Sequence, residues 1–182
     1  YVGTWASNVD FGDNEDTNIE WDFYAGKYFQ LSQAASVDTG IAYYTYHGQD
    51  NEVDRIASDD YAYPEVYVKG GFASALGQTE LNLWYSWDYF GFGGGHTVAM
   101  LAQSYEVAEG HTLRLSIDQS SSLDKDNWVW GETATSYVHY RLEYQTRYVG
   151  FDFVVAAEDT TIDDGIYDDA GTAEIPGCQS YR

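Results

Sequence analysis

Charged side chains recur at alternate positions in several segments of this chain. Glu20 and Asp22 have the i, i+2 spacing of a paired-carboxylate site such as that of a glycosidase. Acids occur on nearly every polar stretch, however, so coincidence explains this pair better than catalysis. In a transmembrane barrel, such alternating charges face a wet lumen. The candidate lumen-lining residues are Glu20, Asp22, Glu65, Lys69, Glu80, Arg114, Asp118, Arg141, Glu143 and Asp152.

Other catalytic motifs are missing from the sequence. The four histidines, His47, His96, His111 and His139, lack the spacing of a zinc site. No Gly-x-Ser-x-Gly elbow occurs. The segment GFGGGH (91–96) is followed by neither the lysine nor the helix of a phosphate-binding loop, so we expect a flexible loop there. We therefore predict that the protein is not an enzyme and has no cofactor.

One acidic segment resembles a calcium-binding loop in composition. DTTIDDGIYDD (159–169) is rich in the oxygen ligands that Ca²⁺ and Mg²⁺ prefer, but its spacing departs from the EF-hand pattern. Two interpretations stay open, a weak divalent-cation site and a disordered acidic loop. The candidate ligands are Asp159, Asp163, Asp164, Asp168 and Asp169.

A period of two residues indicates the elements that carry these side chains. In 19–25, large apolar residues alternate with polar ones, and 81–87, 113–117 and 138–144 repeat the pattern. Successive side chains of a strand point to opposite faces, so these segments are predicted strands. We expect nine, at about 1–8, 17–26, 36–46, 64–72, 79–87, 96–105, 111–118, 136–145 and 148–158. The apolar set expected to face lipid is Ile19, Trp21, Phe23, Leu81, Leu83, Leu113, Leu115, Leu142, Phe151 and Phe153.

Composition narrows the class of protein. The length of 182 residues suits one domain, and the 18 tyrosines and 6 tryptophans suit strands and membrane interfaces. A net charge of −22 argues against a nucleic-acid partner and favours cations. No apolar run reaches the roughly 18–20 residues of a membrane helix. Barrel strands remain possible, because their alternating signal averages to hydrophilic.

The predicted connections alternate in length. Those at 9–16, 47–63, 88–95, 119–135 and 159–182 are mostly long, and those between them are shorter. In an antiparallel meander, alternate connections lie at opposite ends, as in outer-membrane barrels with short periplasmic turns and long external loops. Three of the long loops hold 15 of the 30 acids. A divalent-binding external face and ordinary solvated loops both remain open as explanations.

The expected strand number is odd, whereas single-chain bacterial barrels have even numbers. An unpaired edge in lipid leaves backbone groups without partners. The chain opens at Tyr1 inside a strand pattern and ends in GCQSYR rather than in a strand. We therefore expect an upstream hairpin and a closing strand, about twelve strands in all. A miscount is the other explanation.

Several motifs resemble the TorF family of porin-like outer-membrane proteins of Gram-negative bacteria. They are YVGTWASNVDFGD (1–13), IEWDFYAG (19–26), DTGIAYYTYHG (38–48), YPEVYV (63–68) and LNLWYSWDYFG (81–91). After about residue 96, the similarity is limited to the alternation of apolar and polar residues, and no motif matches. The resemblance implies a transmembrane barrel over 1–182 whose function in that family is itself inferred. The family normally adds a hairpin before Tyr1 and a final strand ending in an aromatic residue.

These observations predict an all-β, antiparallel, up-and-down barrel in the bacterial outer membrane. Its partners would be membrane lipid and small solutes or cations, and oligomers are compatible with it. Either Arg114 and Arg141 pair with carboxylates and close the lumen, or an excess of acids selects cations. Two alternatives remain, a surface-assembly protein with strands paired between copies and a secreted ligand-binding β-sandwich.

Overall fold

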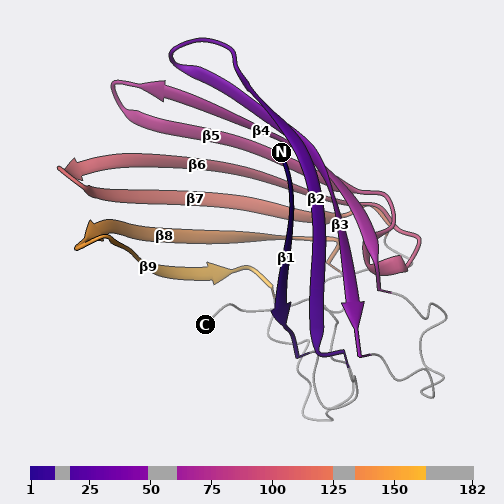
Figure 1. The fold of residues 1–182 in the computed structure, drawn as a ribbon. Coiled ribbons are helices and arrows are strands. Elements are labelled where there is room, and N and C mark those ends of the chain that lie inside the picture. The colour runs from indigo at the N-terminus through magenta and orange to yellow at the C-terminus, as the bar shows by residue number, and fades with distance from the viewer. Residues whose placement is uncertain (11–16, 49–60, 125–133, 163–182) are drawn as a thin grey trace.

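A single sheet contains all nine predicted strands. The computed structural model describes residues 1–10, 17–48, 61–124 and 134–162. Every strand is antiparallel to its neighbours in the sequence, in the order β1 to β9 (Figure 1). This confirms the all-β antiparallel meander. The strands are β1 Val2–Asn8, β2 Ile19–Gln30, β3 Ala35–His47, β4 Tyr63–Ser74, β5 Gly77–Ser86, β6 His96–Ala108, β7 His111–Ser122, β8 Ser136–Tyr148 and β9 Phe151–Thr160.

The strand ends joined by short turns and the strand ends joined by long connections lie at opposite ends of the sheet, as the sequence predicts. The short turns span 31–34, 75–76, 109–110 and 149–150. The last turn lies three residues later than predicted, because β8 continues to Tyr148. Its two residues, Val149 and Gly150, have φ values of 50° and 81°. Positive φ at both central positions matches the twist of the flanking strands, although a β-branched residue rarely adopts it.

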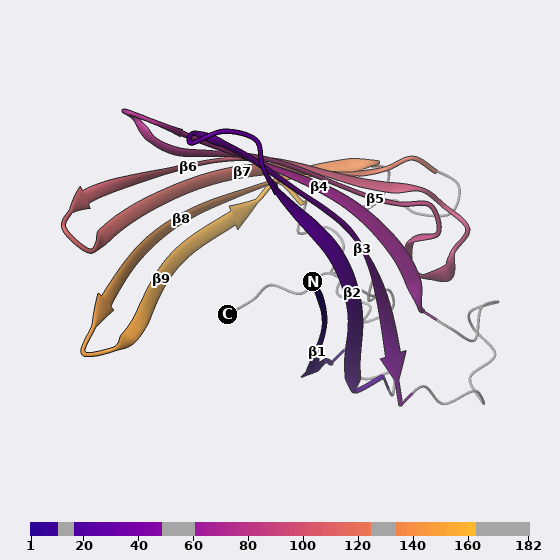
Figure 2. The same cartoon turned by 45° about the horizontal axis from the view of Figure 1, so that its top comes forward.

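The sheet arches strongly but stays open. Figures 1 and 2 show β1 and β9 at the two edges of the arch. In the described part of the chain, neither edge strand has a second strand partner. The predicted closure into a barrel is therefore not present among these residues. No helix that they form has the length and apolar character needed to cross a membrane.

The register sorts charged side chains onto one face, here called the inner face. Only two charged strand residues, Lys27 and Asp159, lie on the opposite or outer face. Cross-strand pairing follows the period-two pattern from β1 to β9, since paired residues share a face. The inner-face charged residues are Glu20, Asp22, Asp38, Glu65, Lys69, Glu80, Glu106, Arg114, Asp118, Arg141, Glu143, Arg147, Asp152 and Glu158.

Contacts between distant strands show that the inner face is the concave one. The Tyr1 hydroxyl, next to β1, lies 2.6 Å from the Tyr67 hydroxyl on β4. Strands are spaced about 4.8 Å apart, so a flat sheet would separate these two strands by roughly 14 Å. The Tyr67 ring also lies over Gly40, where an added Cβ would come within 2.4 Å of its hydroxyl. Glycine at this position lets the ring lie flat across β3.

The only cluster of buried apolar residues found in the described part lies at the long-loop end of the inner face. It contains Val9, Tyr46, Tyr61, Tyr63 and Phe90. The short 3₁₀ segment η1, Tyr89–Gly91, carries Phe90 into this cluster, where it is 3% exposed. Phe92, in the Gly-rich segment predicted to be a flexible loop, is partly buried against the same cluster. Aromatic rings close to one another, rather than aliphatic side chains, hold this end together.

Candidate functional site

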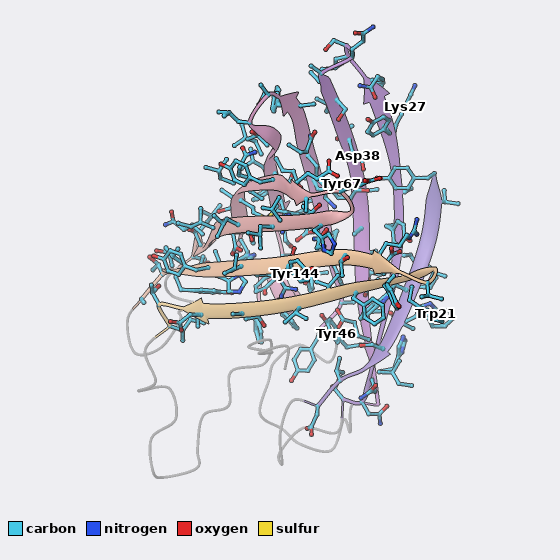
Figure 3. All side chains as sticks on the ribbon, turned by 90° about the vertical axis from the view of Figure 1, so that its left-hand side faces the viewer. Trp21, Lys27, Asp38, Tyr46, Tyr67 and Tyr144 are labelled. Carbon is cyan, nitrogen blue, oxygen red and sulfur yellow. The ribbon has the colours of Figure 1, made fainter. Side chains whose placement is uncertain are left out.

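All ten residues predicted to line a lumen lie on the inner face. They come from six strands, since β2, β4 and β5 supply the first five and β7, β8 and β9 supply the rest. The ten apolar residues predicted to face lipid all lie on the outer face. Figure 3 illustrates the two faces with Tyr46, inside the arch, and Trp21, outside it. The charged residues form two groups with different partners.

The first group is a salt-bridge network across β5, β7, β8 and β9. Arg114 on β7 contacts Glu80 on β5 at 3.1 Å and Glu143 on β8 at 3.3 Å. Arg141 contacts Glu143 at 2.6 Å and also pairs with Glu158 on β9. Each arginine therefore bridges two carboxylates. The fork of guanidinium donors suits such shared contacts, because it presents several N–H groups in fixed directions.

His139 extends this network toward the long-loop end. Its Nδ1 atom lies 2.9 Å from Asp118 Oδ2, and its Nε2 atom lies 3.6 Å from Glu158 Oε2. Gln145 donates a further hydrogen bond to Glu143, at 3.0 Å. Most of these groups are partly exposed, with side-chain exposures of 11% for Glu143 and 29% for Arg141. The network is therefore shielded from bulk water without being dry.

The second group combines carboxylates with tyrosines on β2, β3 and β4. The Tyr46 hydroxyl donates to Glu20 Oε1 at 3.0 Å, and the Tyr44 hydroxyl donates to Glu65 Oε1 at 3.1 Å. The Tyr44 ring stacks on Tyr63, with 4.7 Å between the ring centroids. In this second group, neutral hydroxyl groups donate to the carboxylates, whereas in the first group guanidinium groups do so. Each of these hydrogen bonds satisfies one oxygen of a glutamate with an uncharged donor.

Asp22 is the least satisfied member of this second group. Its side chain is buried, at 8% exposure, and its Oδ1 atom has no hydrogen-bond partner among the described residues. The charges of Glu20 and Glu65 both act on it. Lys69, the base nearest in the sequence to Glu65, lies over the rings of Tyr67 and Trp84, 4.6 and 5.4 Å from their centroids. In the described part of the chain, no ion pair within 4.0 Å includes Glu20, Asp22 or Glu65.

Four charged residues of the inner face were not predicted from the sequence. Asp38 accepts hydrogen bonds from the Tyr1 hydroxyl at 2.8 Å, and in Figure 3 it lies beside Tyr67. Glu158 joins the network at the end of β9, and Arg147 pairs with Asp152 at 2.7 Å. Glu106 lies near a register shift in β6. Strand alternation would have identified Asp38 and Glu158, since both fall within the predicted strands.

The structure tests the proposed divalent-cation site only in part. Asp159 lies in β9, on the outer face, rather than in a loop, and it accepts a hydrogen bond from the backbone N–H of Thr160. Asp163, Asp164, Asp168 and Asp169 lie outside the described residues. Among residues with a described placement, no group of three or more acidic, histidine or cysteine side chains has the arrangement of a metal site.

Comparison with known proteins identifies a family. The model of the Gcw_chp family, described as bacterial proteins of unknown function, matches residues 1–167. No curated protein matches the chain, and no solved structure does. Because the match covers all the described strands, the chain belongs to the Gcw_chp family.

Proposed function

We propose that this sheet is the larger part of an outer-membrane β-barrel whose inner face lines a lumen. The observation that carries the proposal is the outer face, where every strand from β1 to β9 exposes large apolar side chains. Leu83, Leu115 and Leu142, on three different strands, are 60%, 52% and 46% exposed. Soluble proteins seldom expose apolar surfaces of this extent, whereas lipid covers them at no cost.

The order of residues along the outer face supports the same proposal. Aliphatic side chains such as Leu83 and Leu115 occupy the middle of their strands. Aromatic side chains lie toward both ends, with Phe29 and Phe72 near short turns and Trp21 and Tyr43 toward the long loops. Transmembrane barrels have such aromatic girdles, because amphipathic rings favour the headgroup region.

Strand length also agrees with a membrane-spanning role. Strands β2 to β9 contain 10 to 13 residues. A tilted strand needs about 9–11 residues to cross the hydrocarbon core. The two charged residues on the outer face, Lys27 and Asp159, lie toward opposite ends, where their charges reach the interface.

In this proposal the barrel closes through further strands between β1 and β9. An open edge in lipid would leave a row of backbone donors and acceptors without partners. The resemblance to the TorF family agrees with added strands. Closure would enclose the inner face and make it the wall of a passive channel, with an excess of carboxylates that favours cations.

A substitution on the outer face tests the membrane assignment. Leu115→Arg should lower the free energy of unfolding by about 2–4 kcal/mol if the residue lies near the bilayer midplane. Gln119→Arg, on the same face and strand but nearer the long loops, should cost about 1 kcal/mol or less. Urea unfolding in lipid vesicles measures both. Equal costs for the two variants, or no cost for either, would contradict the lipid-facing assignment.

Reconstitution tests the channel. We expect the full-length protein in a planar bilayer under a salt gradient to give a reversal potential that shows cation preference. Anion preference would reject the selectivity, and the absence of conductance would reject an open lumen. In the latter case, the bridges of Arg114 to Glu80 and Glu143 explain the closure, since they cross the inner face from β5 to β8.

One observation favours a second candidate function, a surface-assembly protein. The two edge strands have no strand partner among the described residues, and strands of another copy would satisfy them. Extraction separates the two candidates, because a barrel needs detergent and an assembly paired through its edges yields large particles without it. The third possibility, a β-sandwich, needs a second sheet on the apolar face, and the described residues contain one sheet only.

A further inference from the structure

We propose that the carboxylate–tyrosine group of Glu20, Asp22, Glu65, Tyr44 and Tyr46 binds an organic cation with primary ammonium groups, of the polyamine class. This inference rests on the proposed function, because it names a solute class for the lumen. It starts from three carboxylates on one concave face that have no ion-pair partner among the described residues.

The buried oxygen of Asp22 is the strongest indication of a missing ligand. Asp22 is more than nine-tenths buried, and its Oδ1 atom lacks a hydrogen-bond donor in the described part of the chain. A buried carboxylate oxygen without a donor is costly, so such atoms are nearly always satisfied. The neighbouring charges of Glu20 and Glu65 add repulsion. An ammonium group would supply both the donor and the opposite charge.

The tyrosines prepare the carboxylates for such a ligand. Tyr46 and Tyr44 each donate to one oxygen, Oε1, of Glu20 and Glu65 respectively. Each glutamate thereby keeps its second oxygen for another donor, and its orientation is fixed in advance. The aromatic rings also provide apolar and π surface for methylene groups and cations.

The spacing of the carboxylates favours an extended ligand over a metal ion. Glu20 and Asp22 lie on β2 and Glu65 lies on β4, with β3 between them. Between them, β3 contributes Ala42, which is directly paired with Glu65 and has a small side chain. A metal ion needs its oxygens within about 2.6 Å, and no metal-type group is found among the described residues. A short diamine has two ammonium groups, one for the carboxylates on β2 and one for Glu65 on β4.

The other half of the inner face, on β5 to β9, is a poorer site for a cationic ligand. There, Arg114 and Arg141 already occupy the space between Glu80, Glu143 and Glu158. A cationic ligand would have to displace a guanidinium group. Glu20, Asp22 and Glu65 form no ion pair within 4.0 Å among the described residues, so a mobile cation need not displace an arginine there.

Calorimetric titration of the full-length protein in detergent with putrescine tests the site. We expect Asp22→Asn to weaken binding by at least about tenfold, because one ammonium loses its charged acceptor. Asp152→Asn is the matched control, since it removes the same charge from an exposed pair with Arg147 at the short-turn end. This control should change affinity less than about twofold. If Asp22→Asn does not fold, Glu65→Gln replaces it with the same expectation.

Three outcomes would overturn the inference. Equal losses in the Asp22 and Asp152 variants would mean that a diffuse negative field attracts the diamine. Tighter binding of Ca²⁺ than of putrescine, with the same sensitivity to Asp22→Asn, would mean a metal site. If putrescine does not bind at low ionic strength, the carboxylate–tyrosine group is not a diamine site. Binding in detergent requires no conductance. A failure of the binding test therefore rejects the putrescine site, and a failure of the bilayer test rejects the open channel.

Discussion

The two halves of the inner face hold carboxylates in opposite ways. On β5 to β9, Glu143 contacts both Arg114 and Arg141, so positive charge is built into the fold. On β2 to β4, Glu65 and Glu20 accept hydrogen bonds from tyrosine hydroxyls, and neither forms an ion pair within 4.0 Å among the described residues. The difference shows that a shared face does not imply a shared role. The first half is suited to stabilising the sheet and the second to attracting a cation.

Packing differs between the halves as well. The carboxylate–tyrosine half is covered at its long-loop end by Phe90, which contacts Tyr46 and Tyr63 at centroid distances of 5.2 and 5.1 Å. In the salt-bridged half, the described contacts are mainly polar ones between long side chains. Aromatic packing therefore stabilises one half, and charge pairing stabilises the other.

The largest expected effect tests the aromatic half. Phe90→Ala should lower the free energy of unfolding by about 3–5 kcal/mol, because it opens a cavity between buried tyrosines. Urea titration followed by tryptophan fluorescence measures the change. The control is Phe92→Ala, at a position only partly buried against the same cluster, which should cost less. A loss below about 1 kcal/mol would show that this loop contributes little to the stability of the sheet.

A smaller effect is expected in the salt-bridged half. Arg114→Met should cost about 2–3 kcal/mol, since it leaves Glu80 and Glu143 facing each other without their shared cation. Partial exposure keeps this value below that of a dry buried pair. Arg147→Met is the control, because its pair with Asp152 is about 70% exposed and should cost less than about 1 kcal/mol. If Arg114→Met and Arg147→Met lower the free energy of unfolding equally, charge pairing does not stabilise the salt-bridged half as proposed.

The smallest expected effect concerns a hydrogen bond whose donor is an uncharged hydroxyl. Tyr44→Phe removes the donor to Glu65 and should cost about 1 kcal/mol. Tyr43→Phe, the next residue on the outer face, removes no described hydrogen bond and should change stability by less than about 0.5 kcal/mol. Repeating both unfolding curves in high salt sharpens the comparison. Salt should reduce the cost of Arg114→Met and leave that of Tyr44→Phe unchanged, because only the former is an ion-pair effect.

Some features were accessible from the sequence because strand geometry is local. The period of two placed Asp22 and Arg114 on one face and Leu115 on the other, since successive side chains must alternate. The pairing of β2 with β3, β4 with β5, β6 with β7 and β8 with β9 followed from the short connections, which force neighbours in sequence to pair. The ends of strands were harder to predict from the sequence. The strand β2 continues to Gln30 past Gly26, because Gly26 pairs directly with Gly40 on β3.

Other features depended on the tertiary structure. The sequence contained Arg114, Glu80 and Glu143, but only the curvature and register bring β5 and β8 within reach of one guanidinium. It contained a Gly-rich segment, yet the burial of Phe90 depends on tyrosines from β3 and β4. It indicated a barrel, whereas the sheet has two unpaired edges among the described residues. Alternation is a property of each strand alone, while charge partners and closure depend on strands distant in the sequence.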